Sequence, residues 1–104
     1  MGTFDDRRRG FEEQFRRKEE SSFRLTARRN RLFGTWAASS LGLSGSEADQ
    51  YVKSVLFADL QQPGDDDIIA KVEQDLRAKS MIMTREQLRK KLEECAAEAR
   101  IQLT

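Results

Sequence analysis

The sequence contains no histidine, one cysteine and one proline among its 104 residues. Without histidine, the chain lacks the commonest general base, the commonest transition-metal ligand and the side chain that usually titrates near neutral pH. The single cysteine, Cys95, excludes an intrachain disulfide and a CxxC site. The glycine motifs of dinucleotide sites and P-loops are also missing. The composition therefore predicts a protein that is not an enzyme and that has no cofactor, no catalytic residues and no metal site.

Long apolar runs are missing as well. No stretch approaches the roughly 20 uncharged apolar residues of a membrane span, and residues 1–10 lack the apolar run of a secretory signal. We therefore expect a soluble, cytoplasmic protein without direct membrane insertion. Its length suits one domain. Because 36% of the residues are charged, against about 25% in an average soluble domain, we expect a small core and a highly charged surface.

The net charge of +1 conceals an uneven distribution. Residues 1–31 hold ten Arg and Lys against six Asp and Glu, whereas residues 32–104 hold nine against twelve. A basic N-terminal stretch thus precedes a mildly acidic remainder, a pattern that indicates an anionic partner or a detachable segment.

Helix start and stop signals cover the chain, and almost no strand alternation is present. Gly42 and Pro63-Gly64 are typical helix ends, and Thr84 with Gln87 forms a capping box. Because short loops favour antiparallel neighbours, we predict an all-α fold: a four-helix bundle over residues 19–104, preceded by a charged, mobile N-terminal helix over residues 1–18. The predicted helices span about 3–18, about 19–41, Ser44 or Ser46 to Pro63, about 65–79, and the chain from Thr84 onward.

Two features outside the N-terminal segment have structural interpretations. The acidic run Asp65-Asp66-Asp67 falls where a helix should begin, and carboxylates in a first turn complement the helix dipole, so we favour this role over Mg²⁺ or Ca²⁺ binding. Cys95 shares an apolar helical face with Leu88 and Leu92, which favours a packed core thiol over a reactive one.

The N-terminal segment has an unusual helical pattern. On a helical wheel Phe4, Phe11 and Phe15 fall within about 40° of one another, a stripe much narrower than the roughly 100° of a core-facing helix. Acidic residues precede basic ones by four positions, as in Glu12 with Arg16 and Glu13 with Arg17, which favours helix. This stripe can order on a partner surface or fold back on its own bundle, and the sequence leaves both alternatives open.

The arginine clusters of this segment are compatible with more than one partner. Arg7-Arg8-Arg9 and Arg16-Arg17-Lys18 could form a nucleic-acid arm, but the six acidic residues nearby would weaken phosphate attraction. A protein partner is therefore favoured over nucleic acid. A small nucleic-acid-binding helical protein that uses the N-terminal Arg clusters remains the alternative.

The order of residues along nearly the whole chain resembles a known family. The matching pieces begin with Phe4-Asp5-Asp6-Arg7, and the most specific is Ala27-Arg28-Arg29-Asn30-Arg31-Leu32, followed by Gly34 and Trp36-Ala37-Ala38. By these pieces the chain is identified as similar to the zeta subunit family of alphaproteobacterial F-type ATP synthase, natural inhibitors of ATP hydrolysis.

The resemblance implies a four-helix, non-catalytic regulatory subunit whose N-terminal helix is inhibitory. Residues up to about Lys18 would insert into a catalytic interface between the alpha and beta subunits, blocking hydrolysis while permitting synthesis. The gamma subunit is a further expected partner, and the free protein is expected to be a monomer. Through the ATP synthase it would lie peripherally on the cytoplasmic face of the inner membrane. The implied anchors are Phe4, Phe11 and Phe15, and the implied polar contacts are Arg7, Arg8, Arg9, Glu12 and Glu13.

Two details qualify this transfer. Many relatives carry a His-Asp pair where this chain has Arg17-Lys18, so no histidine titration can tune inhibition here. The polar block of residues 28–31 is interpreted first as a solvated face with ion pairs to neighbouring helices. A weak anion or nucleotide contact through Arg28, Arg29, Asn30 and Arg31 is the alternative.

Overall fold

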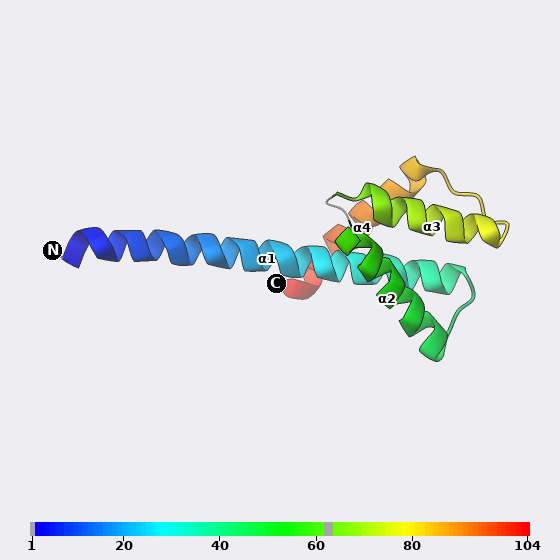
Figure 1. Ribbon diagram of the computed structural model, residues 1–104, viewed down its shortest axis with the longest axis horizontal. Coiled ribbons are helices and arrows are strands. Elements are labelled where there is room, and N and C mark those ends of the chain that lie inside the picture. Colours follow the sequence, from blue (N-terminus) through cyan, green and yellow to red (C-terminus); the bar gives the residue numbers. More distant parts are fainter. Residues whose placement is uncertain (1, 62–63) are drawn as a thin grey trace.

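The computed structural model describes the backbone of residues 2–61 and 64–104, and the side chains of residues 20–58 and 64–104. Within these ranges the chain forms four α-helices and no strand. The all-α class is therefore confirmed. The helices are α1 Gly2–Ser40, α2 Gly45–Gln61, α3 Asp66–Ala78 and α4 Arg85–Leu103 (Figure 1).

One helix, α1, replaces the two that the sequence predicted over about 3–18 and 19–41. It runs for 39 residues without interruption, which corresponds to about 58 Å. The predicted boundary was wrong because Lys18, Glu19 and Glu20 are good helix formers, and Gly10 costs only about 1 kcal/mol relative to alanine. The side chains of residues 1–19, with the phenylalanine stripe and the clustered charges, lie outside the described part, as does any test of the segment's mobility.

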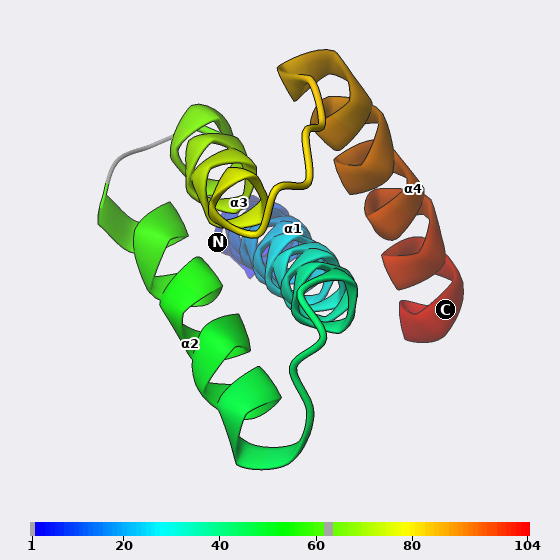
Figure 2. The same ribbon diagram turned by 90° about the vertical axis from the view of Figure 1, so that its right-hand side faces the viewer.

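The C-terminal half of α1 lies at the centre of the bundle. Figure 2 shows α2, α3 and α4 placed around it, and Figure 1 shows the N-terminal half extending beyond the other helices. Phe33 and Ala37 of α1 are fully buried there. The apolar core is completed by residues from all three surrounding helices: Val55, Ile68, Ile69, Val72, Leu76, Leu88, Leu92 and Cys95.

A close approach between α1 and α2 occurs at Gly34. A Cβ atom at this position would lie 3.4 Å from the Cα of Val52 and 3.4 Å from the Cβ of Val55. Glycine therefore lets the two backbones come together, and a side chain larger than a methyl group would separate them.

Cys95 is buried in the core, as the sequence predicted. Burial raises the pKa of its thiol, an effect that nearby Glu94 reinforces and that Lys91 and Arg29 oppose. A buried thiol with a raised pKa is a weak nucleophile, so Cys95 acts as a packing residue.

The helix ends follow the predicted signals in two of the connections. At Gly42 (φ 77°) the amide of Leu43 donates to the carbonyl of Ala38, closing α1 in a Schellman motif. The Thr84 hydroxyl accepts from the amide of Gln87, and the Gln87 side chain accepts from the Thr84 amide, which confirms the capping box of α4. Helix α2 begins at Gly45, between the two serines considered as caps.

The end of α3 uses the same Schellman geometry without glycine. The Met81 amide donates to the Leu76 carbonyl at 2.9 Å, and Ser80, between them, has a φ of 62°. This left-handed conformation costs a non-glycine residue roughly 1–2 kcal/mol.

We predict that Ser80→Gly stabilises the protein by about 1 kcal/mol, because glycine adopts this conformation without a Cβ clash. This gain exceeds the additional conformational entropy that glycine loses on folding. The free energy of unfolding, measured by urea denaturation, should rise. The matched variant Gly42→Ala should lower it by a similar amount. A Ser80→Gly variant less stable than the parent would contradict the prediction.

A polar network joins α2 to α3. The Tyr51 hydroxyl donates to Asp75 Oδ2 at 2.9 Å, and Lys71 Nζ lies 3.0 Å from the same oxygen. The ammonium also lies 5.3 Å from the centre of the Tyr51 ring. Burial raises the pKa of Tyr51 well above its usual value, and the hydrogen bond and the charge of Asp75 add to this shift.

We predict that Tyr51, the only tyrosine of the chain, titrates at higher pH in the folded than in the unfolded protein. The stability associated with its raised pKa is fully present below about pH 10, the unfolded value, and is lost as pH rises from there toward the folded pKa. Tyrosinate absorbance in buffer and in concentrated urea measures both titrations. Coincident midpoints would contradict the prediction, and Tyr51→Phe should make stability less dependent on pH in this alkaline range.

Candidate functional site

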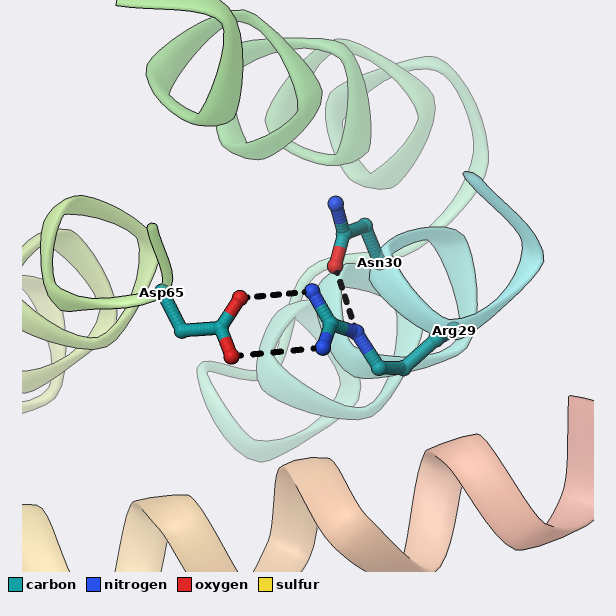
Figure 3. A network of polar contacts seen from close by, with 3 residues as sticks. All are labelled: Arg29, Asn30 and Asp65. Atoms are coloured by element: carbon teal, nitrogen blue, oxygen red, sulfur yellow. Dashed lines mark hydrogen bonds and ion pairs between the residues drawn. The ribbon is translucent and has the colours of Figure 1, made fainter. Parts of the chain in front are cut away.

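The most specific sequence block, residues 27–32, lies in the C-terminal half of α1, within the bundle. There Arg29 forms a bidentate ion pair with Asp65 (Figure 3). Its Nη2 donates to Asp65 Oδ1 at 2.8 Å and its Nη1 donates to Asp65 Oδ2 at 3.3 Å. The Nε donates to Asn30 Oδ1 at 3.0 Å. All three nitrogens of the guanidinium are therefore engaged, and its orientation is fixed.

This network fastens α1 to the start of α3. Asp65 is the residue before α3, and its carboxylate makes no capping bond within that helix because it is turned to Arg29. The Arg29 side chain is 17% exposed and Asn30 is 2% exposed, whereas the Asp65 side chain is 49% exposed, so water reaches the ion pair mainly from the α3 side. Forked arginine–carboxylate pairs of this kind are stronger and more directional than single contacts.

A cleft of about 480 Å³ opens beside this network. Arg89 and Arg100 contribute positive charge to its lining, but Asp65, Asp66 and Glu93 contribute negative charge. Arg89 Nη2 lies 3.3 Å from Asp66 Oδ1. The mixed charge makes the cleft a poor site for an isolated anion.

The acidic run before α3 has the structural role that the sequence favoured. Asp66 and Asp67 lie in the first turn of α3, where they complement the helix dipole, while Asp65 and Asp66 each pair with an arginine of another helix. Within the part of the chain whose side chains are described, no group of three or more acidic or cysteine residues is arranged to hold a metal ion.

The four residues 28–31 do not form one site. Arg29 and Asn30 are turned into the bundle, whereas Arg28 and Arg31 are exposed. These two arginines line a second cleft of about 360 Å³, together with Phe23, Arg24, Ala27, Leu56 and Leu103. The ion-paired interpretation thus holds for Arg29, and the structure brings Arg28 and Arg31 to a different surface.

Sequence reasoning missed both the partner of Arg29 and the second cleft. Asp65 lies 36 residues from Arg29, and no local spacing rule connects them. The second cleft combines residues of three helices, which only the tertiary packing brings together.

These features define the class of protein: a small all-helical protein in which polar side chains join the helices and the first helix extends beyond the bundle. The sequence matches the ATPase inhibitor subunit zeta family over residues 1–102, and the chain belongs to that family. Members are non-catalytic inhibitor subunits, which implies association with ATP synthase. The expected family and the expectation that the protein is not an enzyme are therefore confirmed.

A solved structure supports the same fold. It is the solution NMR structure of a protein 41% identical to this chain, with a TM-score of 0.67, and the match covers 78% of this chain and 92% of the other. No curated protein sequence matches the chain. Among the described residues, none of the helices combines the length and apolarity needed to cross a membrane.

We predict that Arg29→Lys lowers the free energy of unfolding by about 1–2 kcal/mol, because lysine cannot reproduce the fork to Asp65 and the bond to Asn30 together. Arg28→Lys is the matched control and should leave stability within about 0.5 kcal/mol of the parent, since Arg28 is exposed. Thermal or urea unfolding measures both. Equal stability of the two variants would remove the structural role assigned to Arg29.

Proposed function

We propose that the protein inhibits ATP hydrolysis by the F-type ATP synthase by inserting residues 1–18, as the N-terminal part of α1, into a catalytic interface between the alpha and beta subunits. The observation that carries the proposal is family membership over residues 1–102 together with the unbroken backbone of α1. A continuous helix gives an inserted segment a stiff connection to a folded body.

The anchoring of α1 supports this function. Phe33 and Ala37 are buried between the other helices, and Arg29 is tied to Asp65, so the C-terminal half of α1 is held from several sides. A load on the N-terminal half would be transmitted along the helix to this anchored half. The body would then act as a stop that limits how far the helix enters a partner.

The sequence of residues 1–18, which we call the arm, offers apolar and charged side chains for the contacts that insertion requires. Residues Phe4, Phe11 and Phe15 offer a narrow apolar stripe, and burial of each would contribute roughly 1.5–3 kcal/mol. By register along an unbroken helix, these positions fall within about 40° of the position of Phe33, which faces the bundle core. The partner would therefore cover the N-terminal continuation of the face that the bundle covers farther along.

The charged residues of the arm would set its register in the interface. Arg7, Arg8 and Arg9 would meet acidic groups, and Glu12 and Glu13 would meet basic ones, an arrangement that opposes misplacement by even one helical turn. The gamma subunit would be a further contact. Residues 19–104 would form the folded body of a free monomer, and the bound protein would lie on the cytoplasmic face of the membrane through the ATP synthase.

For the polar block, we assign a structural role to Arg29 and Asn30. A weak nucleotide contact at Arg28 to Arg31 would have to compete with Asp65 for the Arg29 guanidinium. The paired state of Arg29 favours the structural role.

We predict that the full-length protein slows ATP hydrolysis by the matching purified ATPase and that a chain lacking residues 1–18 does not. The reason is that the inhibitory contacts reside in the arm, whereas the described core lies entirely within residues 33–99. Hydrolysis is measured with increasing amounts of each protein. Equal inhibition by the two proteins would exclude the proposed role of the arm.

Single substitutions locate the contacts more finely. Phe11→Ala and Phe15→Ala should each raise the half-inhibitory concentration about tenfold or more, given the apolar area they remove. Phe57→Ala is the matched control, because Phe57 is 62% exposed on α2 and lies outside the arm. If Phe11→Ala instead lowers the melting temperature by many degrees, the stripe belongs to the core of the free protein.

A further inference from the structure

A second surface with binding character lies on the side of the bundle where α1, α2 and the end of α4 meet. The groove of about 360 Å³ introduced above, which we call the arginine groove, is lined by apolar side chains, which we call its floor, and by basic side chains, which we call its rim. Phe23 is 73% exposed and Leu103 is 43% exposed, although both are large apolar side chains. Leu56 and Ala27 complete the floor.

The rim is positively charged and is not neutralised within the described part of the protein. Arg24, Arg28 and Arg31 line the groove, and none of them forms an ion pair with a described side chain. Arg29, between them in the chain, is by contrast fully engaged with Asp65. Three guanidinium groups that have no ion pair with a described side chain lie beside exposed apolar side chains, and they match an amphipathic segment that carries acidic residues next to its apolar face.

The other candidate occupants fit this groove less well. Residues 1–18 of the same chain hold six basic against four acidic residues, so they bring like charge to the rim. They also belong to the same helix as the rim arginines and would have to reverse direction to reach them. A second copy joined by two-fold symmetry would face three arginines with three arginines, which is repulsive.

We infer that the arginine groove is a second docking surface, which binds an acidic amphipathic helix of an ATP synthase subunit. This inference rests on the proposed function, because it assigns the same partner. The arm and the rim arginines of the groove all belong to α1, so once the arm or the groove has bound the enzyme, the effective concentration of the other near its own binding site is raised. The groove thus increases affinity, whereas the arm stops the enzyme.

The test is direct binding of the full-length protein to the purified ATPase head at low and at moderate salt. The double variant Arg28→Gln/Arg31→Gln should raise Kd at least tenfold and make binding less dependent on salt, since two charge-assisted contacts are lost. At saturating concentration it should inhibit hydrolysis as completely as the parent. The single variant Leu103→Ser should raise Kd several-fold through the apolar floor.

The matched control is Arg77→Gln/Lys90→Gln, which removes the same charge from exposed positions on α3 and α4. It should bind like the parent, and circular dichroism should show all variants equally folded. A parental Kd for Arg28→Gln/Arg31→Gln overturns the groove while the proposed function stands. A raised Kd for Arg28→Gln/Arg31→Gln together with a parental Kd for Leu103→Ser also overturns the groove as a docking surface. The arginines would then act only through general electrostatic attraction. A parent that does not bind the ATPase head refutes the proposed function, and the groove with it.

Discussion

The burial of the C-terminal half of α1 is the constraint on which the rest of the structure depends. This stretch contributes Phe33, Ala37 and the close contact at Gly34, and α2, α3 and α4 all pack against it. The other helices could not share one core without it. Because the same helix continues to Gly2, the central element of the fold is also the element that leaves it. Folding of the body therefore determines the direction in which the arm projects.

A chain with this many charges and so small a core uses polar contacts to hold its shortest helix. Helix α3 has 13 residues, and its buried apolar face is supplemented by polar links to each of the other helices. Asp65 at its start pairs with Arg29 of α1, Asp75 accepts from Tyr51 of α2, and Glu73 lies 3.5 Å from Arg85 of α4. Each link is modest, at most about 1–2 kcal/mol, because every one of them keeps at least one partner partly exposed to water. Their value lies in fixing the position of a helix too short to define it by packing alone.

The sequence predicted what local chemistry determines. The capping box at Thr84, the stop at Gly42 and the burial of Cys95 follow from neighbours within a few positions, and the structure confirms them. The break expected near residue 18 was wrong because the backbone propensity for helix is continuous there, even though the apolar pattern changes. The Arg29–Asp65 pair and the arginine groove arise from tertiary packing, which no spacing rule along one chain encodes.

The block Arg28-Arg29-Asn30-Arg31 shows why a motif need not be one site. Successive residues of a helix point about 100° apart, so four consecutive polar residues cannot all face one ligand. In α1 this rotation sends Arg29 and Asn30 toward the bundle and Arg28 and Arg31 to the surface. The inward pair closes α3 onto α1 and thereby determines the shape of the body. The outward pair is carried by the same turns of α1 and lines the groove that α1 forms with α2 and the end of α4. A specific sequence block can thus combine residues that join two helices with residues that line a surface cleft, without any residue serving both.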